Sequence, residues 1–118
     1  MNTRKTGADG EQKAVDFLIA NNYEIIERNV HFGKVGEIDI VAKEKSDRTV
    51  VFIEVKFNRS KSPFGKPEFR CDQRKMKQIV KLVNLYIYNR KIYGKPVRID
   101  MIAIDNDGIR HYKNCMII

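Results

Sequence analysis

The stretch from Gly36 to Lys56 constrains this chain more than any other part of it. It contains two β-branched, apolar runs at residues 36–42 and 50–56, which are separated by a short polar segment. Four charged residues lie inside these runs: Glu37, Asp39, Glu54 and Lys56. An ionised carboxylate inside a strand loses hydration and needs a partner. The stretch therefore predicts a β-hairpin that carries a polar site.

Alternation along the two strands places the charged residues on one face. Side chains point to opposite faces of a sheet at successive positions, so Glu37 and Asp39 share a face and Ile38 falls on the other, apolar face. A symmetric hairpin pairs residues whose numbers sum to 93, which puts Asp39 opposite Glu54 and Glu37 opposite Lys56. A slip by one residue would turn carboxylates into the apolar layer. The pattern therefore favours the register that brings the carboxylates together.

Two carboxylates on directly opposite residues repel each other, because their Cβ atoms lie roughly 5 Å apart. Lys56 or a divalent cation such as Mg²⁺ would offset this repulsion, and Glu11 adds a third oxygen ligand if its helix covers this face. A bound Mg²⁺ would activate a water molecule, and Lys56 would stabilise charge in the transition state. The alternative is a solvated, salt-bridged face of an antiparallel sheet.

The 118 residues fit one domain, 42% of them are hydrophobic, and we expect a flexible arm at residues 1–7. The patterns predict helices at residues 8–21 and 70–91, and strands at residues 23–32, 36–43, 49–57, 97–104 and 109–118. Two prolines and a glycine predict a loop at residues 58–67. The order α-β-β-β-α-β indicates an α/β fold with a mixed central sheet flanked by helices.

The chain is basic, with 23 Lys and Arg against 15 Asp and Glu and a formal net charge of +8. Such a balance suits a polyanionic partner, although composition alone is equally compatible with an ordinary basic surface. The cations that follow the hairpin are the candidates for contact with a phosphate backbone: Arg59, Lys61, Lys66 and Arg74.

The cysteines and the apolar runs bear on localisation. Cys71 and Cys115 fit no metal-binding spacing, so we interpret them as thiols in a reducing compartment, with one disulfide as the alternative. No apolar run approaches the roughly 20 residues that span a bilayer, and the N-terminus lacks a signal-peptide pattern. We therefore expect a cytoplasmic protein without a membrane partner.

The segment from Asp39 to Glu54-Val55-Lys56 resembles the PD-(D/E)xK nuclease signature, with Ile38 in place of the usual proline. Residues 10–14, Asn29, residues 36–42 and 51–56, Lys75 and residues 98–100 are similar, in the same order, to the YraN-type family of nuclease-like proteins. The resemblance covers residues 7–105. The family usually has Thr-Arg directly after the lysine. In this chain Phe57 and Asn58 stand between Lys56 and Arg59.

This resemblance implies a restriction-endonuclease-like fold, similar to that of Holliday-junction resolvases, and by the same similarity a homodimer. It implies Glu11, Asp39 and Glu54 as metal ligands and Lys56 as the catalytic lysine. It also implies supporting roles for Glu37, Lys75 and Arg98, with phosphate or a neighbouring carboxylate as the partner of the two cations.

We therefore expect an endonuclease dependent on Mg²⁺ or Mn²⁺ that hydrolyses phosphodiester bonds of DNA at branched or junction structures. The alternative from a different class is a non-catalytic nucleic-acid-binding protein that retains the nuclease fold. DNA is favoured over RNA as the substrate through the resemblance, since the residues themselves do not separate the two.

Overall fold

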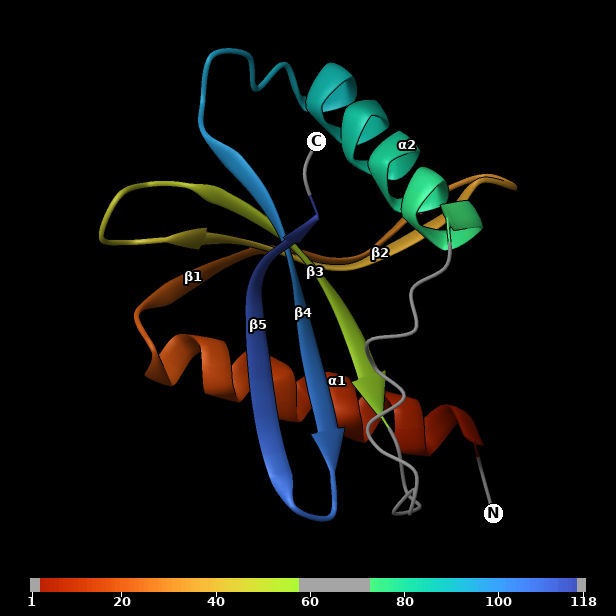
Figure 1. Ribbon diagram of the computed structural model, residues 1–118, viewed down its shortest axis with the longest axis vertical. Coiled ribbons are helices and arrows are strands. Elements are labelled where there is room, and N and C mark those ends of the chain that lie inside the picture. Colours follow the sequence, from red (N-terminus) through yellow and green to blue (C-terminus); the bar gives the residue numbers. More distant parts are fainter. Residues whose placement is uncertain (1–2, 58–72, 117–118) are drawn as a thin grey trace.

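The computed structural model describes residues 3–57 and 73–116 (Figure 1). The helices are α1 (Thr3–Ala20) and α2 (Gln73–Arg90), and the strands are β1 (Tyr23–Phe32), β2 (Gly36–Glu44), β3 (Val50–Phe57), β4 (Val97–Asp105) and β5 (Gly108–Met116). The predicted α-β-β-β-α-β order is confirmed, with β5 as the final strand. This is the element order that we expected of a restriction-endonuclease-like domain.

The five strands form one mixed sheet in the order β1-β2-β3-β4-β5. The pairs β1–β2, β2–β3 and β4–β5 are antiparallel, whereas β3 and β4 are parallel. Parallel neighbours need a crossover connection, and α2 lies in the connection between β3 and β4. The expected α/β class with a mixed central sheet is therefore confirmed.

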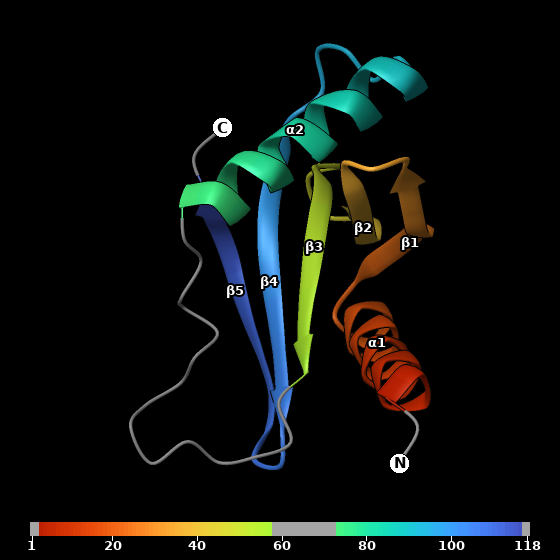
Figure 2. The same ribbon diagram turned by 90° about the vertical axis from the view of Figure 1, so that its right-hand side faces the viewer.

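The two helices pack on opposite faces of the sheet (Figure 2). One apolar cluster joins α2 to alternate residues of the central strands: Val41, Val50, Phe52, Ile79, Leu82, Val83, Tyr86 and Ile99. The other cluster joins α1 to the intervening residues: Ala14, Val15, Leu18, Ile40, Val51, Ile53, Ile102 and Ile104. The alternation of the strands thus supplies two apolar layers, one for each helix.

Helix α1 begins at Thr3, five residues before its predicted start. Residues 3–7, which we expected in a flexible arm, are helical. They contain no proline, so nothing in the local sequence stops the helix, and the glycine at position 7 costs only about 1 kcal/mol relative to alanine.

The register of β2 and β3 follows the predicted sum of 93 from Lys43↔Val50 to Ile40↔Ile53, where the ladder ends. The predicted backbone pairs of Asp39 with Glu54 and of Glu37 with Lys56 are therefore absent from it. Ile38 also departs from alternation, since it packs in the α2 cluster with Val41 rather than beside Ile40.

The backbone of β1 is irregular opposite this departure. Asn29 lies between the β1 partners of Ile38 and Ile40, and its φ of +53° is in the left-handed region. A left-handed residue interrupts the alternation of its own strand, so β1 is irregular beside the position of Asp39.

Several predictions lie outside the described residues: the loop at residues 58–67 with Arg59, Lys61 and Lys66, the residue Cys71, and the end of the final strand at residues 117–118. Over residues 3–57 and 73–116, no helix combines the length and apolarity needed to cross a membrane.

Candidate functional site

Asp39 lies where the β2–β3 ladder ends, and its side chain accepts a hydrogen bond from the backbone of β3. The N–H of Val55 donates to Oδ2 of Asp39 at 2.8 Å. The carboxylate is thereby held beside β3, one residue from Glu54. The other oxygen, Oδ1, accepts no hydrogen bond from the described side chains of residues 9–57 and 73–115, so a ligand could bind it.

Glu54 comes from the C-terminal half of β3, and its side chain is 20% exposed. The ammonium group of Lys75, on the first turn of α2, lies 3.1 Å from Oε1 of Glu54. Of the two partners that the sequence suggested for Lys75, phosphate and carboxylate, the structure shows the carboxylate. Lys56 follows two residues later on the same face of β3 and is half-buried. Among the described side chains, which are those of residues 9–57 and 73–115, its ammonium group has no ion-pair or hydrogen-bond partner.

Glu11 reaches the site from α1. Its side chain is 14% exposed, and Oε1 accepts hydrogen bonds from Nε of Arg28 at 3.2 Å and from Nδ2 of Asn29 at 2.9 Å. The approach of α1 depends on Gly10, because a Cβ atom there would lie 2.7 Å from Cδ2 of Phe57. The absence of a side chain at position 10 therefore lets the helix bring Glu11 beside the sheet.

Glu37 occupies the outer part of the site. It is exposed, and its Oε2 lies 3.0 Å from Nε2 of His31 on β1. The predicted neighbour Lys56 does not contact it in the described part of the chain. Glu37 is thus close enough to add negative charge, but it pairs with a different strand.

The pKa of Asp39 reflects its burial and the three carboxylates near it. Burial, followed by the negative charges of Glu54, Glu11 and Glu37, raises it from 3.8 to about 6, although the hydrogen bond from Val55 acts in the opposite direction. Such a shift at a cluster of carboxylates is a common mark of a functional site.

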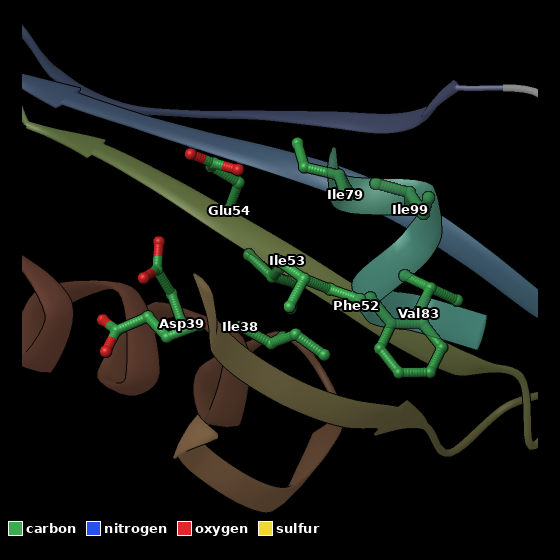
Figure 3. Close-up of a pocket in the computed structure, with 10 residues that line it drawn as sticks. Ile38, Asp39, Phe52, Ile53, Glu54, Ile79, Val83 and Ile99 are labelled. Carbon is green, nitrogen blue, oxygen red and sulfur yellow. The ribbon is translucent and has the colours of Figure 1, made fainter. Parts of the chain in front are cut away.

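A cavity of about 20 Å³ lies between these carboxylates and α2, which is room for about one water molecule. Figure 3 shows the carboxylates of Asp39 and Glu54 together at one end and Phe52, Ile79, Val83 and Ile99 at the other. The cavity thus has a polar end at the carboxylates and an apolar end against α2.

The oxygen donors suit a hard divalent cation, and Oδ1 of Asp39 is available to it. In the described part of the chain, however, no three His, Cys, Asp or Glu side chains are gathered closely enough to hold a metal ion. Glu11, Asp39 and Glu54 therefore share a region without forming a preassembled metal site. Glu11 and Glu54 are directed towards Arg28 and Lys75 instead.

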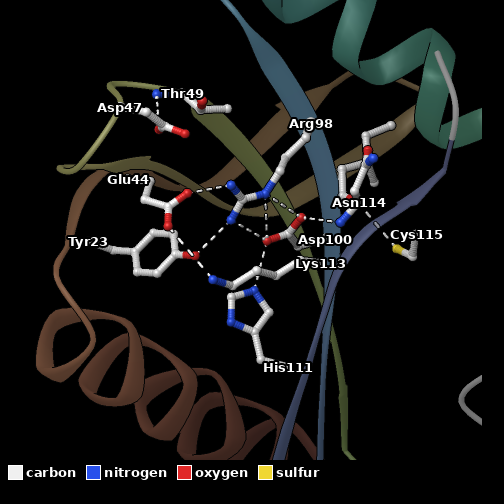
Figure 4. Close-up of polar contacts among 11 residues, drawn as sticks. Tyr23, Glu44, Asp47, Thr49, Arg98, Asp100, His111, Lys113, Asn114 and Cys115 are labelled. Atoms are coloured by element: carbon white, nitrogen blue, oxygen red, sulfur yellow. Dashed lines mark hydrogen bonds and ion pairs between the residues drawn. The ribbon is translucent and has the colours of Figure 1, made fainter.

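Arg98 does not join this site. It precedes Ile99, which packs on the α2 side, and it lies on the opposite face in a buried polar network (Figure 4). Its guanidinium donates to the carboxylates of Asp100 and Glu44 and, at 2.7 Å, to the hydroxyl of Tyr23. Its partner is again a carboxylate, and its role there is to hold strands together.

Asp100 is the centre of that network and is fully buried. Besides Arg98, it accepts hydrogen bonds from Nε2 of His111 at 2.7 Å and from the backbone N–H of Asn114 at 2.8 Å. Burial alone would raise the pKa of Asp100, but these hydrogen bonds outweigh it and lower the pKa. The hydrogen bond from Asn114 stabilises an irregular part of β5. There the register between β4 and β5 shifts, and Asn114 has a φ of +53°.

Sequence reasoning missed Arg28 as the partner of Glu11 and the N–H of Val55 as the partner of Asp39. Arg28 carried no signal, because one cation in a charged strand resembles any other. The Val55 bond depends on where the ladder ends, which periodicity does not reveal.

A family model described as "Uncharacterised protein family UPF0102" matches residues 10–104. A UPF0102 protein of Persephonella marina is 41% identical over 108 residues, which covers 92% of this chain and 90% of the relative. A UPF0102 protein of Fusobacterium nucleatum is 39% identical over 114 residues and covers 97% and 92%.

Among solved structures, a complex of EndoMS with dsDNA is similar with a TM-score of 0.44 and 18% identity. The similarity covers 84% of this chain and 38% of that chain, so the present chain spans well under half the length of EndoMS. The family match and the relatives cover nearly the whole described fold and both acidic strands, and they confirm the resemblance to the YraN-type family: this chain belongs to the uncharacterised protein family UPF0102.

Proposed function

We propose that this protein is a metal-dependent endonuclease that hydrolyses phosphodiester bonds of DNA. The observation that carries the proposal is the meeting of Asp39 and Glu54 where the β2–β3 ladder ends, with Lys56 on the same face. Glu11 adds a third carboxylate from α1. Carboxylates of like charge are costly to gather, so their convergence from three elements favours a functional role over a solvated sheet face.

Asp39, Glu54 and Glu11 would hold the metal ion, because their oxygen atoms match the preference of Mg²⁺ and Mn²⁺. A bound ion of this kind supplies neutralisation of phosphate charge and activation of a water molecule. The free Oδ1 of Asp39 supports this assignment, since the Val55 hydrogen bond fixes the carboxylate and leaves one oxygen available.

The chain's own side chains would position the substrate. Lys56 has no partner among the described side chains and would stabilise negative charge on the phosphate as the bond breaks. The apolar end of the cavity, with Phe52 and Ile79, gives the carboxylates a less polar surrounding on one side. A less polar surrounding strengthens each charge interaction at the site.

The substrate class follows from charge and from the family resemblance. The net charge of +8 favours a polyanion, and Arg74 lies exposed on the first turn of α2, next to Lys75. DNA over RNA, and branched or junction structures over plain duplex, rest on the similarity of the PD-(D/E)xK motif to junction resolvases. Lys61 and Lys66 are further candidates for phosphate contacts outside the described residues.

A cleavage assay tests the proposal. Purified protein is incubated with linear, nicked and four-way-junction DNA and with an RNA of the same sequence, with Mg²⁺, Mn²⁺ or EDTA. We expect metal-dependent cleavage that falls about 10²–10³-fold in Lys56→Met and at least as much in Asp39→Asn and Glu54→Gln. Glu24→Gln, an exposed change on β1, is the matched control and should retain activity.

Equal inactivity of the wild type and Asp39→Asn on every substrate would contradict the nuclease proposal. Salt-sensitive DNA binding without metal-dependent cleavage would instead support the non-catalytic alternative. Faster cleavage of the RNA than of any DNA would overturn the assignment of substrate.

A further inference from the structure

The carboxylates of the candidate site are already paired with basic side chains. Lys75 on α2 contacts Glu54 at 3.1 Å, and Arg28 on β1 contacts Glu11 at 3.2 Å. Asp39 has no basic partner among the described side chains, which are those of residues 9–57 and 73–115. Two of the three predicted metal ligands are therefore neutralised from within the protein, by residues of two different elements.

The Lys75–Glu54 pair is accessible to ions in solution. The side chains are 39% and 20% exposed, so solvent reaches the pair. The two residues belong to different elements, and their charged ends form an ion pair. A small cation that approaches Glu54 would meet this ion pair.

Other residues hold α2 on the sheet. Gln78 donates a hydrogen bond from Nε2 to the backbone oxygen of Val35 at 2.7 Å, and Ile79, Leu82 and Val83 are buried against the sheet. An ion pair at this level of exposure contributes at most about 1 kcal/mol to stability. The position of Lys75 therefore requires another explanation than packing of the helix.

We propose that Lys75 is a positioning residue that occupies Glu54 in the metal-free protein and competes with the divalent cation for that carboxylate. This inference rests on the proposed metal site. The ammonium group keeps the carboxylates from repelling each other while no metal is bound, and it lowers the affinity of the site for the metal. Metal binding and the ion pair are thus alternatives for the same negative charge.

The experiment measures Mn²⁺ binding by calorimetry in the wild type and in Lys75→Met, Lys75→Arg and Lys77→Met. Lys77 is two residues further along α2 and exposed. Lys77→Met therefore removes an equal charge from the same helix but leaves the Lys75–Glu54 ion pair intact. We expect Lys75→Met to bind Mn²⁺ about tenfold more tightly, as removal of one positive charge close to a divalent cation predicts. Lys75→Arg and Lys77→Met should stay close to the wild type.

A thermal melt supplies a second measurement that needs no activity. In EDTA, Lys75→Met should melt roughly 2–5 °C below the wild type, because the carboxylates lose a counter-ion. Saturating Mn²⁺ should raise its Tm by more than it raises that of the wild type. A purely structural role of Lys75 would give the first difference without the second.

The outcomes separate this inference from the proposed function. If the wild type binds Mn²⁺ and Lys75→Met binds it equally or more weakly, competition by Lys75 is wrong while the metal site stands. If neither protein binds Mn²⁺, the metal site itself is wrong and the inference falls with it. Should Lys75→Met not fold, Lys75→Gln provides the same comparison.

Discussion

At the scale of the residue, Asp39 combines two opposing demands. The protein fixes its carboxylate with the Val55 hydrogen bond, yet it also buries that carboxylate near Glu54, Glu11 and Glu37. The pKa of about 6 means that the ionised form, which a metal would require, is costly in the metal-free protein. Stability is thus lost at the position where the proposed chemistry needs charge, as is common at functional sites.

The direction of the pKa shift of Asp39 predicts how Asp39→Asn changes the stability of the protein. Because the folded pKa of about 6 lies above the ordinary 3.8, the folded protein binds this proton more tightly, and stability falls as the pH rises from 3.8 through 6. An asparagine side chain cannot ionise, so we expect the variant to exceed the wild type by about 1–2 kcal/mol in free energy of unfolding at pH 7.5, after allowing for partial solvent screening.

Urea denaturation in EDTA at several pH values measures this difference. The advantage of Asp39→Asn should shrink at pH 4, where the wild-type carboxyl is largely protonated in the folded protein. Asp9→Asn, at an exposed position of α1, should change stability by less than about 0.5 kcal/mol at both pH values. Equal or lower stability of Asp39→Asn at pH 7.5 would contradict the predicted cost of its charge.

At the scale of the element, the distance between α1 and β3 decides whether Glu11 reaches the site. A side chain at Gly10 would lie within 3.3 Å of three atoms of Phe57. We expect Gly10→Ala to lower the free energy of unfolding by about 1 kcal/mol, since overpacking outweighs the gain of up to about 1 kcal/mol in helix propensity. Chemical denaturation measures it, and Mn²⁺ affinity should fall in parallel. A variant more stable than the wild type would show that α1 relaxes freely.

The second prediction at this scale concerns the junction of β4 and β5. Asp100 accepts hydrogen bonds from Arg98, His111 and the N–H of Asn114. In Asp100→Asn the buried guanidinium of Arg98 loses one of its two carboxylate partners and keeps Glu44, and an amide NH₂ faces other donors. We expect a loss of about 3–5 kcal/mol in stability.

Thermal or urea unfolding at pH 7 checks this loss, and Asp107→Asn in the turn between the strands should be nearly neutral. The pKa of Asp100 is lowered on folding, so its contribution is present above pH 3.8 and declines as the pH falls below that value. A loss below about 1 kcal/mol would mean that the network contributes little to holding β5.

At the scale of the whole molecule, the net charge of +8 predicts that nucleic-acid affinity depends steeply on salt. Arg74, exposed beside Lys75 at the start of α2, is the described cation best placed to contact a phosphate near the site. We expect Arg74→Gln to weaken DNA binding on all sequences and to reduce the slope of log K against log salt by about 1.

Fluorescence anisotropy in EDTA, over a range of KCl concentrations, measures this slope without interference from cleavage. Lys45→Gln, in the exposed turn between β2 and β3, removes a charge away from the site and should leave the slope unchanged. Binding by the wild type that is insensitive to salt would contradict the use of the basic charge for phosphate contacts.

The sequence by itself determined the elements and their register. The strand at residues 23–32 was predicted to the residue, and the sum of 93 holds wherever the β2–β3 ladder exists. Alternation and loop length are local properties, so they need no knowledge of distant segments. The same local reasoning put Asp39, Glu54 and Lys56 in one neighbourhood and offered Glu11 as a third carboxylate if its helix covered this face.

Only the tertiary structure decided how those residues are paired. It ended the ladder at Ile40, turned Ile38 to the α2 side, joined Lys75 to Glu54, and placed Arg98 in a network on the opposite face. The raised pKa of Asp39 depends on burial and on charges from other elements. These features arise from contacts between segments far apart in the chain, and electrostatic interactions depend on distance and burial, which periodicity along one strand does not encode.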